Sequence, residues 1–332
     1  MGGTATKQAV GDPSKQARGR ERTVKKRPIT TKARSATLNG PFAELETFLM
    51  ADVSEEMPHL GKGSYAIVKK LTHKGETYAA KQLHTTLFDF ASSEEREGML
   101  TQFARECRLL QRAAHPNVVK FVGLHMDKVS PLPYLVMELM KTTLSAHLDT
   151  FGKPETPTDY HILSDVALGL QFLHKHIPPI IHRDLSANNV LLSSTLQAKI
   201  SDLGMAKIID RNPNEKLKLT QTKAPGTACY MPPEALSEVP DYDTNIDTYS
   251  FGVLMIHLLC GQWPIPSLGS VVNPENSDDL IPVTEFDRRI KFINDIGHDH
   301  PLISLIQKCL HNNPDSRPSA PSIAERVMAV MV

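Results

Sequence analysis

Residues 180–204, which read IIHRDLSANNVLLSSTLQAKISDLG, constrain the fold of this chain more than any other stretch. Two short apolar segments, VLL and AKIS, predict a pair of buried strands joined by a turn. A polar turn in front of them carries Asp184 and Asn189, and the second strand leads directly into Asp202. The predicted strand pair therefore brings two carboxylates and one carboxamide close together.

These three side chains suit the transfer of a phosphoryl group to a hydroxyl. One carboxylate accepts the hydroxyl proton, while the other oxygen donors hold magnesium, a hard cation, against phosphate groups. The residue types alone therefore favour magnesium-dependent phosphoryl transfer.

The same stretch resembles the catalytic loop and the metal-binding loop of the eukaryotic protein kinases, and its motifs are most similar to those of the tyrosine-kinase-like group. The resemblance implies that Asp184, which follows Arg183 in the catalytic motif, is the catalytic base. It also implies that Asn189 and Asp202 bind Mg2+. The metal-binding loop reads Asp-Leu-Gly where the family usually has Asp-Phe-Gly, and Leu203 keeps the apolar side chain at that place.

A glycine-containing segment earlier in the chain resembles the kinase loop that covers the nucleotide phosphates. Residues 59–71, HLGKGSYAIVKKL, place two glycines between strand-like segments, with Ala66 at the third family glycine. The sequence YAAK follows after a turn and resembles the strand that carries the phosphate-binding lysine, Lys81. By this resemblance the residues that bind ATP are Leu60, Gly61, Gly63, Val68, Ala79, Lys81, Glu138, Met140 and Leu192.

A helix is predicted over residues 98–113, where apolar side chains recur at helical spacing. Glu106 stands three residues after Phe103, so its carboxylate lies on or beside the apolar face and needs a partner. The kinase resemblance supplies Lys81, through the ion pair of the active state.

Strands are predicted over residues 118–125 and 134–140, and beyond them the apolar spacing becomes helical. The stretch 264–282 contains four prolines and little periodicity, so it is predicted to be a loop. Asp247 begins an apolar stretch, and we expect it to cap that helix and, by resemblance, to bond the backbone of the catalytic loop. The predicted helices are 162–173, 247–260, 302–310 and 322–332.

Residues 226–234, GTACYMPPE, resemble the end of a kinase activation segment, with Pro232 where the family usually has Ala. The resemblance implies a structural ion pair between Glu234 and Arg317. It also implies that the Thr227 hydroxyl contacts the catalytic base.

The resemblance predicts an α+β, bilobal protein-kinase fold over residues 54–330, with a small β-rich N-lobe at about 54–138 and a large helical C-lobe at about 141–330. Residues 1–40 hold ten Lys and Arg against two acidic residues, a charge of +8 that leaves −8 for the remainder. With few apolar side chains to offset ordering entropy, this basic tail is predicted to be disordered. Residues 41–53 have the spacing of a short amphipathic lead-in.

The expected activity is transfer of the ATP γ-phosphoryl group to a protein hydroxyl. Ser/Thr kinases usually carry Lys two residues after the catalytic Asp, and tyrosine kinases carry Arg in this loop, whereas here it reads Ser-Ala-Asn. Gly226-Thr227 resembles the Ser/Thr form, so Ser/Thr is favoured over tyrosine or dual specificity. Two further classes of protein stay open at this point, a pseudokinase scaffold and a small-molecule kinase.

Partner and location follow from smaller signals. The four cysteines lack the spacing of a zinc or redox site, so buried free thiols are expected. The sequence lacks a long apolar run and a signal-peptide core, so we expect a cytoplasmic protein. The kinase resemblance implies a protein substrate, and we expect no nucleic-acid partner. The N-terminus, MGGTAT, fits the N-myristoylation pattern at Gly2, which predicts that the basic tail contacts a membrane; the alternatives are a nuclear-import patch at Lys25-Lys26-Arg27 and an inert solubilising tail. No pattern indicates an oligomeric state.

Overall fold

The computed structural model describes residues 2, 40–42, 45, 57–63, 65–126, 132–208, 229–236, 243–261, 272–273, 276–280 and 294–331. Apart from Gly2 and Gly40, the predicted basic tail lies outside these residues. Thr227 and most of the predicted lead-in 41–53 lie outside them as well. In the part of the chain that is described, no helix has the length and apolar character needed to cross a membrane.

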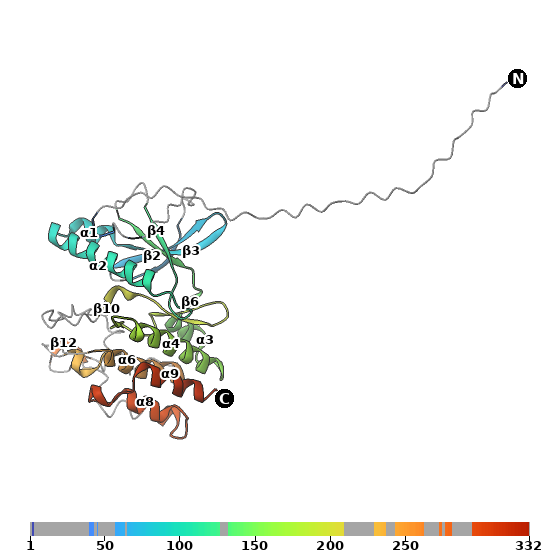
Figure 1. Ribbon diagram of the computed structural model, residues 1–332, viewed down its shortest axis with the longest axis vertical. Helices are drawn as coiled ribbons and strands as arrows, with labels where there is room; N and C mark the ends of the chain where they lie inside the picture. Colours follow the sequence, from blue (N-terminus) through green and yellow to red (C-terminus); the bar gives the residue numbers. More distant parts are fainter. Residues whose placement is uncertain are drawn as a thin grey trace. The chain divides into compact units, whose positions relative to one another are not determined.

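An antiparallel five-stranded sheet forms the N-lobe, in the order β1-β2-β3-β5-β4 (Figure 1). Strand β3 lies at its centre, so Lys81 pairs in register with Val68 of β2 on one side and Leu135 of β5 on the other. The lysine is therefore held by backbone bonds on both flanks. The strands are β1 (His59–Lys62), β2 (Ala66–His73), β3 (Glu76–Leu83), β4 (Phe121–His125) and β5 (Tyr134–Glu138).

Two helices follow β3: α1 (Thr85–Phe90) and α2 (Ser93–Arg112). The start of α2 is fixed by a capping box, in which Ser92 Oγ accepts from the Glu95 backbone N–H and the Glu95 carboxylate accepts from the Ser92 N–H. The helix predicted at 98–113 is confirmed, and it begins five residues earlier. Glu106 is buried on it, as its spacing from Phe103 predicts.

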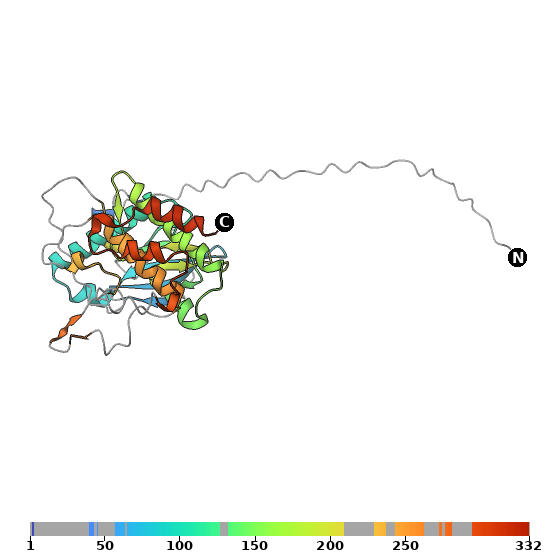
Figure 2. The same cartoon turned by 90° about the horizontal axis from the view of Figure 1, so that it is seen from below.

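The C-lobe is mainly helical, and short strands carry its polar loops (Figures 1 and 2). Four of its helices confirm the predicted ones with shifted ends, whereas the helix Leu144–Phe151 was not predicted. The helices are α3 (Leu144–Phe151), α4 (Thr158–Lys175), α6 (Asn245–Cys260), α8 (Ile303–Cys309) and α9 (Ala320–Ala329). The strands are β6 (Thr142–Thr143), β7 (Ile180–Ile181), β8 (Val190–Leu192), β9 (Ala198–Ile200), β10 (Lys207–Ile208), β11 (Val272–Asn273) and β12 (Asn276–Leu280). Single 3-10 turns are η1 (Gly40–Phe42), η2 (Leu203–Met205), η3 (Pro233–Leu236) and η5 (Pro314–Ser316).

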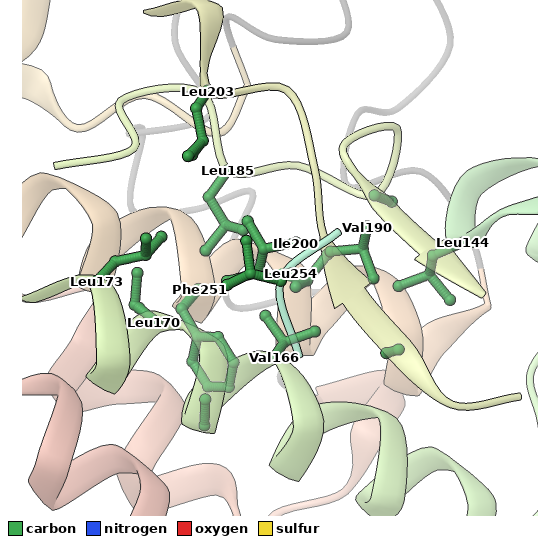
Figure 3. Packing of buried hydrophobic residues seen from close by; sticks show 14 of the residues in the cluster. Leu144, Val166, Leu170, Leu173, Leu185, Val190, Ile200, Leu203, Phe251 and Leu254 are labelled. Carbon is green, nitrogen blue, oxygen red and sulfur yellow. The ribbon is translucent and has the colours of Figure 1, made fainter. Parts of the chain in front are cut away.

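One apolar cluster lies beneath the polar loops of the C-lobe and fixes their backbone. Leu185 of the catalytic loop and Leu203 of the metal-binding loop are both buried in it, together with Leu170 of α4 and Leu254 of α6 (Figure 3). The packing of α4 against β9 is close, because a Cβ on Gly169 of α4 would lie 3.0 Å from Ile200 Cδ1 of β9 and 2.6 Å from the Asn117 carbonyl oxygen. The closely packed core therefore holds the backbone of both loops in place.

The structure corrects three predictions. The stretch 264–282 contains the antiparallel pair β11–β12, whose strands read Val-Asn and Asn-Ser-Asp-Asp-Leu and lack the apolar alternation by which strands are recognised. Asp247 does not cap α6, because the helix begins at Asn245 and Thr244 occupies the cap position. Strand β4 begins at Phe121 rather than 118, because Val118 instead bridges to β9.

The cysteine prediction is confirmed for the described thiols. All four are thiols outside any disulfide; Cys107, Cys229 and Cys309 are buried as predicted, whereas Cys260 is only half-buried. Burial raises the pKa of the Cys260 thiol to about 11, so even this cysteine stays protonated at neutral pH.

Candidate active site

Three charged side chains from three elements meet between the two lobes. Lys81 Nζ of β3 lies 2.7 Å from Glu106 Oε1 of α2 and 2.9 Å from Asp202 Oδ1, which follows β9. The predicted ion pair of Lys81 with Glu106 is therefore formed. The same ammonium also reaches the predicted metal-binding aspartate, so one cation organises both carboxylates.

Burial and charge act in opposite directions on this trio. Burial alone would lower the pKa of Lys81, but the carboxylates of Asp202 and Glu106 outweigh it and raise that pKa. Burial opposes ionisation of Asp202 as well, yet the Lys81 charge and the Gly204 N–H lower its pKa. Burial raises the pKa of Glu106, which makes it the carboxylate most dependent on Lys81. Lys81 and Asp202 are thus charged at neutral pH.

Asp247 of α6 holds the backbone of the catalytic loop between β7 and β8. Its two carboxylate oxygens accept the backbone N–H groups of His182 and Arg183, each at 2.8 Å. Oδ2 also lies 2.8 Å from His174 Nε2 of α4. The predicted bonding of Asp247 to the loop backbone is confirmed. Because Asp247 is fully buried, these contacts are shielded from water.

His182 joins the catalytic loop to the metal-binding loop. Its Nδ1 accepts from the Asp184 backbone N–H at 3.2 Å, so the proton on the ring is at Nε2, which donates to the Ser201 carbonyl at 2.9 Å. Arg183 Nε donates to the Met205 carbonyl on the far side of the same loop. The backbone of Asp184 is therefore linked through a buried imidazole to Ser201, the residue before Asp202.

Asn189 and Asp184 lie in direct contact. The carboxamide nitrogen of Asn189 donates to the Asp184 carboxylate at 2.9 Å and to the Asp184 carbonyl at 2.7 Å. This orientation leaves the carboxamide oxygen of Asn189 as the atom that can coordinate a cation. With the partly exposed carboxylate of Asp202, it forms a hard oxygen donor set of the type that Mg2+ prefers, so the residues fit that ion.

The backbone in this site adopts uncommon conformations. Arg183 has φ 67° and Asp202 has φ 58°, the left-handed region that non-glycine residues rarely adopt. Such outliers often occur at functional sites, where surrounding contacts impose them. Next to Asp202, a Cβ on Gly204 would lie 3.0 Å from Asp202 Oδ1 and 3.3 Å from Glu106 Oε2. Glycine therefore allows α2 and the metal-binding loop to approach closely.

The residues predicted to contact ATP come from five segments around this trio. Leu60 and Gly61 lie in the exposed strand β1, and Gly63 follows this strand. The Gly63 N–H donates to the Ala66 carbonyl at 2.8 Å. Val68 lies on β2 and Ala79 is buried on β3. Met140 follows β5 in the hinge, residues 138–140, which leads from the N-lobe to the C-lobe. Leu192 is buried at the end of β8.

Several supporting contacts were missed by sequence reasoning, because they use ordinary polar residues without a motif. His84, directly after β3, donates from Nε2 to the Gly63 carbonyl at 2.9 Å, and its backbone N–H donates to the Tyr65 carbonyl at 3.0 Å. Gln102 of α2 donates to the Gly204 carbonyl at 3.1 Å. These contacts tie the glycine loop and the metal-binding loop to their neighbours.

A separate ion pair, between Lys199 and Glu138, holds the hinge. Lys199 of β9 lies 2.7 and 2.9 Å from the two carboxylate oxygens of Glu138, and the Lys120 backbone N–H donates to the same group at 2.7 Å. The side chain of Glu138 is thus occupied by structural contacts. Its predicted contact with ATP therefore rests on its backbone groups alone.

Comparison with known proteins gives a consistent result. A protein-family model described as "Protein kinase domain" matches residues 54–328. The chain is 31% identical to calmodulin-binding receptor-like cytoplasmic kinase 2 of Arabidopsis thaliana, over 80% of this chain and 66% of the relative. It is also 31% identical to dual specificity protein kinase shkA of Dictyostelium discoideum, over 82% of this chain and 48% of the relative.

A third relative is cysteine-rich receptor-like protein kinase 10 of Oryza sativa subsp. japonica, with 29% identity over 86% of this chain and 43% of the relative. The chain thus spans less than two thirds of the length of each of these three curated relatives. Receptor-like and cytoplasmic kinases of plants are prominent among the similar proteins.

Proposed function

The chain belongs to the protein kinase family, and from this premise we propose that it transfers the γ-phosphoryl group of ATP to a serine or threonine hydroxyl of a protein. The observation that carries the proposal is the joined trio of Lys81, Glu106 and Asp202. A scaffold that had lost catalysis would have no need to keep all three charges in contact.

Some of the site residues bind ATP, and others orient and deprotonate the acceptor hydroxyl. The Lys81 ammonium binds the phosphate oxygens of ATP, and Glu106 keeps it aimed at them. The glycine loop covers the phosphates and excludes water. Asp184 orients the acceptor hydroxyl and takes its proton as the hydroxyl oxygen bonds to the γ-phosphorus and the bond from that phosphorus to the β–γ bridging oxygen breaks, releasing ADP. Asn189 keeps the Asp184 carboxylate in place.

Asn189 and Asp202 are the residues that would hold Mg2+. The ion, when bound, neutralises negative charge on the phosphate oxygens. Asp202 has its pKa lowered by Lys81, so its carboxylate is ionised and ready for a cation at neutral pH.

The choice of Ser/Thr rests on the end of the activation segment. Gly226 and Thr227, followed by Tyr230, resemble the form found in Ser/Thr kinases. Tyr230 joins the end of this segment to the C-lobe, because its hydroxyl lies 2.6 Å from His257 Nδ1 and accepts from the Ala187 N–H of the catalytic loop at 3.4 Å. The segment after Thr227 therefore lies against the loop that carries Asp184. A relative named as a dual specificity kinase keeps tyrosine as the second candidate acceptor.

Phosphoamino-acid analysis tests this choice. The purified chain is incubated with labelled ATP, Mg2+ and a mixture of Ser, Thr and Tyr peptides, and the labelled residues are identified. We expect phosphoserine and phosphothreonine, because Thr227 is the residue type that accompanies aliphatic acceptors. Label confined to phosphotyrosine would refute the Ser/Thr assignment and leave the kinase assignment standing.

We also propose that the kinase domain occupies residues 54–330.

We further propose that the N-terminal tail attaches the chain to membranes. Gly2 fits the myristoylation pattern, and the basic residues of the tail would supply the second signal that a single acyl chain needs. Replacing Gly2 by Ala should then move the protein from the membrane fraction of the cell to the soluble fraction. An unacylated Gly2 with the same distribution in both proteins would exclude this attachment.

A further inference from the structure

A short segment ahead of the family match is packed into the core of the kinase domain. The match begins at residue 54, yet Gly40–Phe42 forms a 3-10 turn, and the Leu45 N–H donates to the Phe42 carbonyl at 3.0 Å. Phe42 and Leu45 are only 5% and 6% exposed. Two apolar side chains outside the matched region are therefore as buried as core residues inside it.

The partner of this segment is α2, the helix that carries Glu106. Phe42 packs edge-on against Phe103, with ring centroids 6.3 Å apart and an interplanar angle of 65°. The Arg108 guanidinium donates a hydrogen bond to the Pro41 carbonyl. The helix is thus held by one apolar contact three residues before Glu106 and by one charge-assisted contact two residues beyond it.

Helical spacing connects these contacts to the active site. Phe103 and Glu106 are three residues apart, so their side chains leave the helix on neighbouring parts of one face. Phe103 is 3% exposed and Glu106 is likewise buried, so the face as a whole is packed. A shift of α2 that relaxed the Phe42 contact would also change the 2.7 Å separation between Glu106 and Lys81.

We propose that Gly40–Phe42 and Leu45 form a brace for α2, and that Phe42 is a positioning residue that acts on phosphoryl transfer through Glu106. The activity readout rests on the proposed kinase function, whereas the structural readout below does not. The brace is part of the chain itself, so no partner protein is required for it to act.

The test compares Phe42→Ala with Phe90→Ala in the full chain. Phe90 lies in the N-lobe on α1 and is 89% exposed, so its removal controls for the loss of a phenylalanine. We expect Phe42→Ala to lower kcat/KM for ATP by about 5- to 150-fold, the usual range for coupling between two sites. Amide hydrogen exchange over α2 should become faster in Phe42→Ala and stay unchanged in Phe90→Ala.

A double-mutant cycle separates positioning from general destabilisation. If Phe42 acts through Glu106, then Phe42→Ala should have little further effect on kcat/KM in a Glu106→Gln background. A full, additive loss in that background would overturn the proposal. Phe42→Leu, which keeps an apolar side chain, should restore most of the activity and provides a test if the alanine variant does not fold.

The two proposals can fail separately. If the parent chain transfers no phosphoryl group to any peptide, the proposed function is wrong, and hydrogen exchange still tests the brace. If Phe42→Ala leaves the exchange of α2 unchanged, the brace is wrong whatever the activity of the parent chain.

Discussion

Replacing Asp184 by Asn is expected to lower kcat by about 10²- to 10⁴-fold, the usual contribution of a general base. The carboxamide is the same size and its oxygen can still accept from Asn189, whose Nδ2 now lies 2.9 Å from the carboxylate. The fold and ATP binding should therefore survive, while the group that takes the hydroxyl proton is lost. Steady-state kinetics with a peptide substrate, together with the midpoint of thermal unfolding, measure both effects.

Two comparisons make this experiment specific. Asp299→Asn changes an exposed carboxylate of the C-lobe and should leave kcat unchanged. Lys81→Met should also abolish most turnover. The cause in this variant is weaker binding of the phosphates, whereas the group that accepts the proton is still present. An Asp184→Asn protein as fast as the parent would show that another group is the base.

The charged core of the site was predictable from sequence because each residue carries a motif or a period. Asp184, Asn189 and Asp202 stand at the ends of short apolar strands, and β8 was predicted with its observed bounds. Glu106 was recognised from its spacing to Phe103, and the kinase resemblance supplied Lys81 as its partner. In each case a local pattern determined where the side chain would lie.

Other parts depend on contacts between distant segments, which local patterns do not encode. Asp247 was expected to cap α6, yet it lies at the third position of the helix and uses its carboxylate on the catalytic loop. Gln102 and His84 carry no motif, so their bonds to the loops appear only in three dimensions. Phe42 had helical spacing, but neither its 3-10 turn nor its contact with Phe103 could be read from that spacing.

The second large effect concerns the ion pair of Glu234 with Arg317, which joins the end of the activation segment to η5. The two guanidinium nitrogens lie 2.5 and 2.9 Å from the two carboxylate oxygens, and the Arg317 side chain is fully buried. This predicted pair is therefore formed, and it is bidentate. The guanidinium also lies over the Tyr249 ring of α6, 5.0 Å from its centroid, and Nε donates to the His311 carbonyl at 2.8 Å.

Glu234→Gln should lower the free energy of unfolding by about 3–5 kcal/mol, because it leaves the Arg317 charge buried without a counter-ion. Urea unfolding followed by circular dichroism measures the change. Glu325→Gln, at an exposed position of α9, should stay within about 0.5 kcal/mol of the parent.

A double variant decides whether the buried charge is the cause. Arg317→Met removes the charge together with its bonds to His311 and Asn245, so alone it should also destabilise the protein. If the unpaired charge dominates, Glu234→Gln combined with Arg317→Met should cost clearly less than the sum of the two single changes. Strict additivity would mean that the two side chains stabilise the C-lobe independently, and the ion pair would then have no structural role of its own.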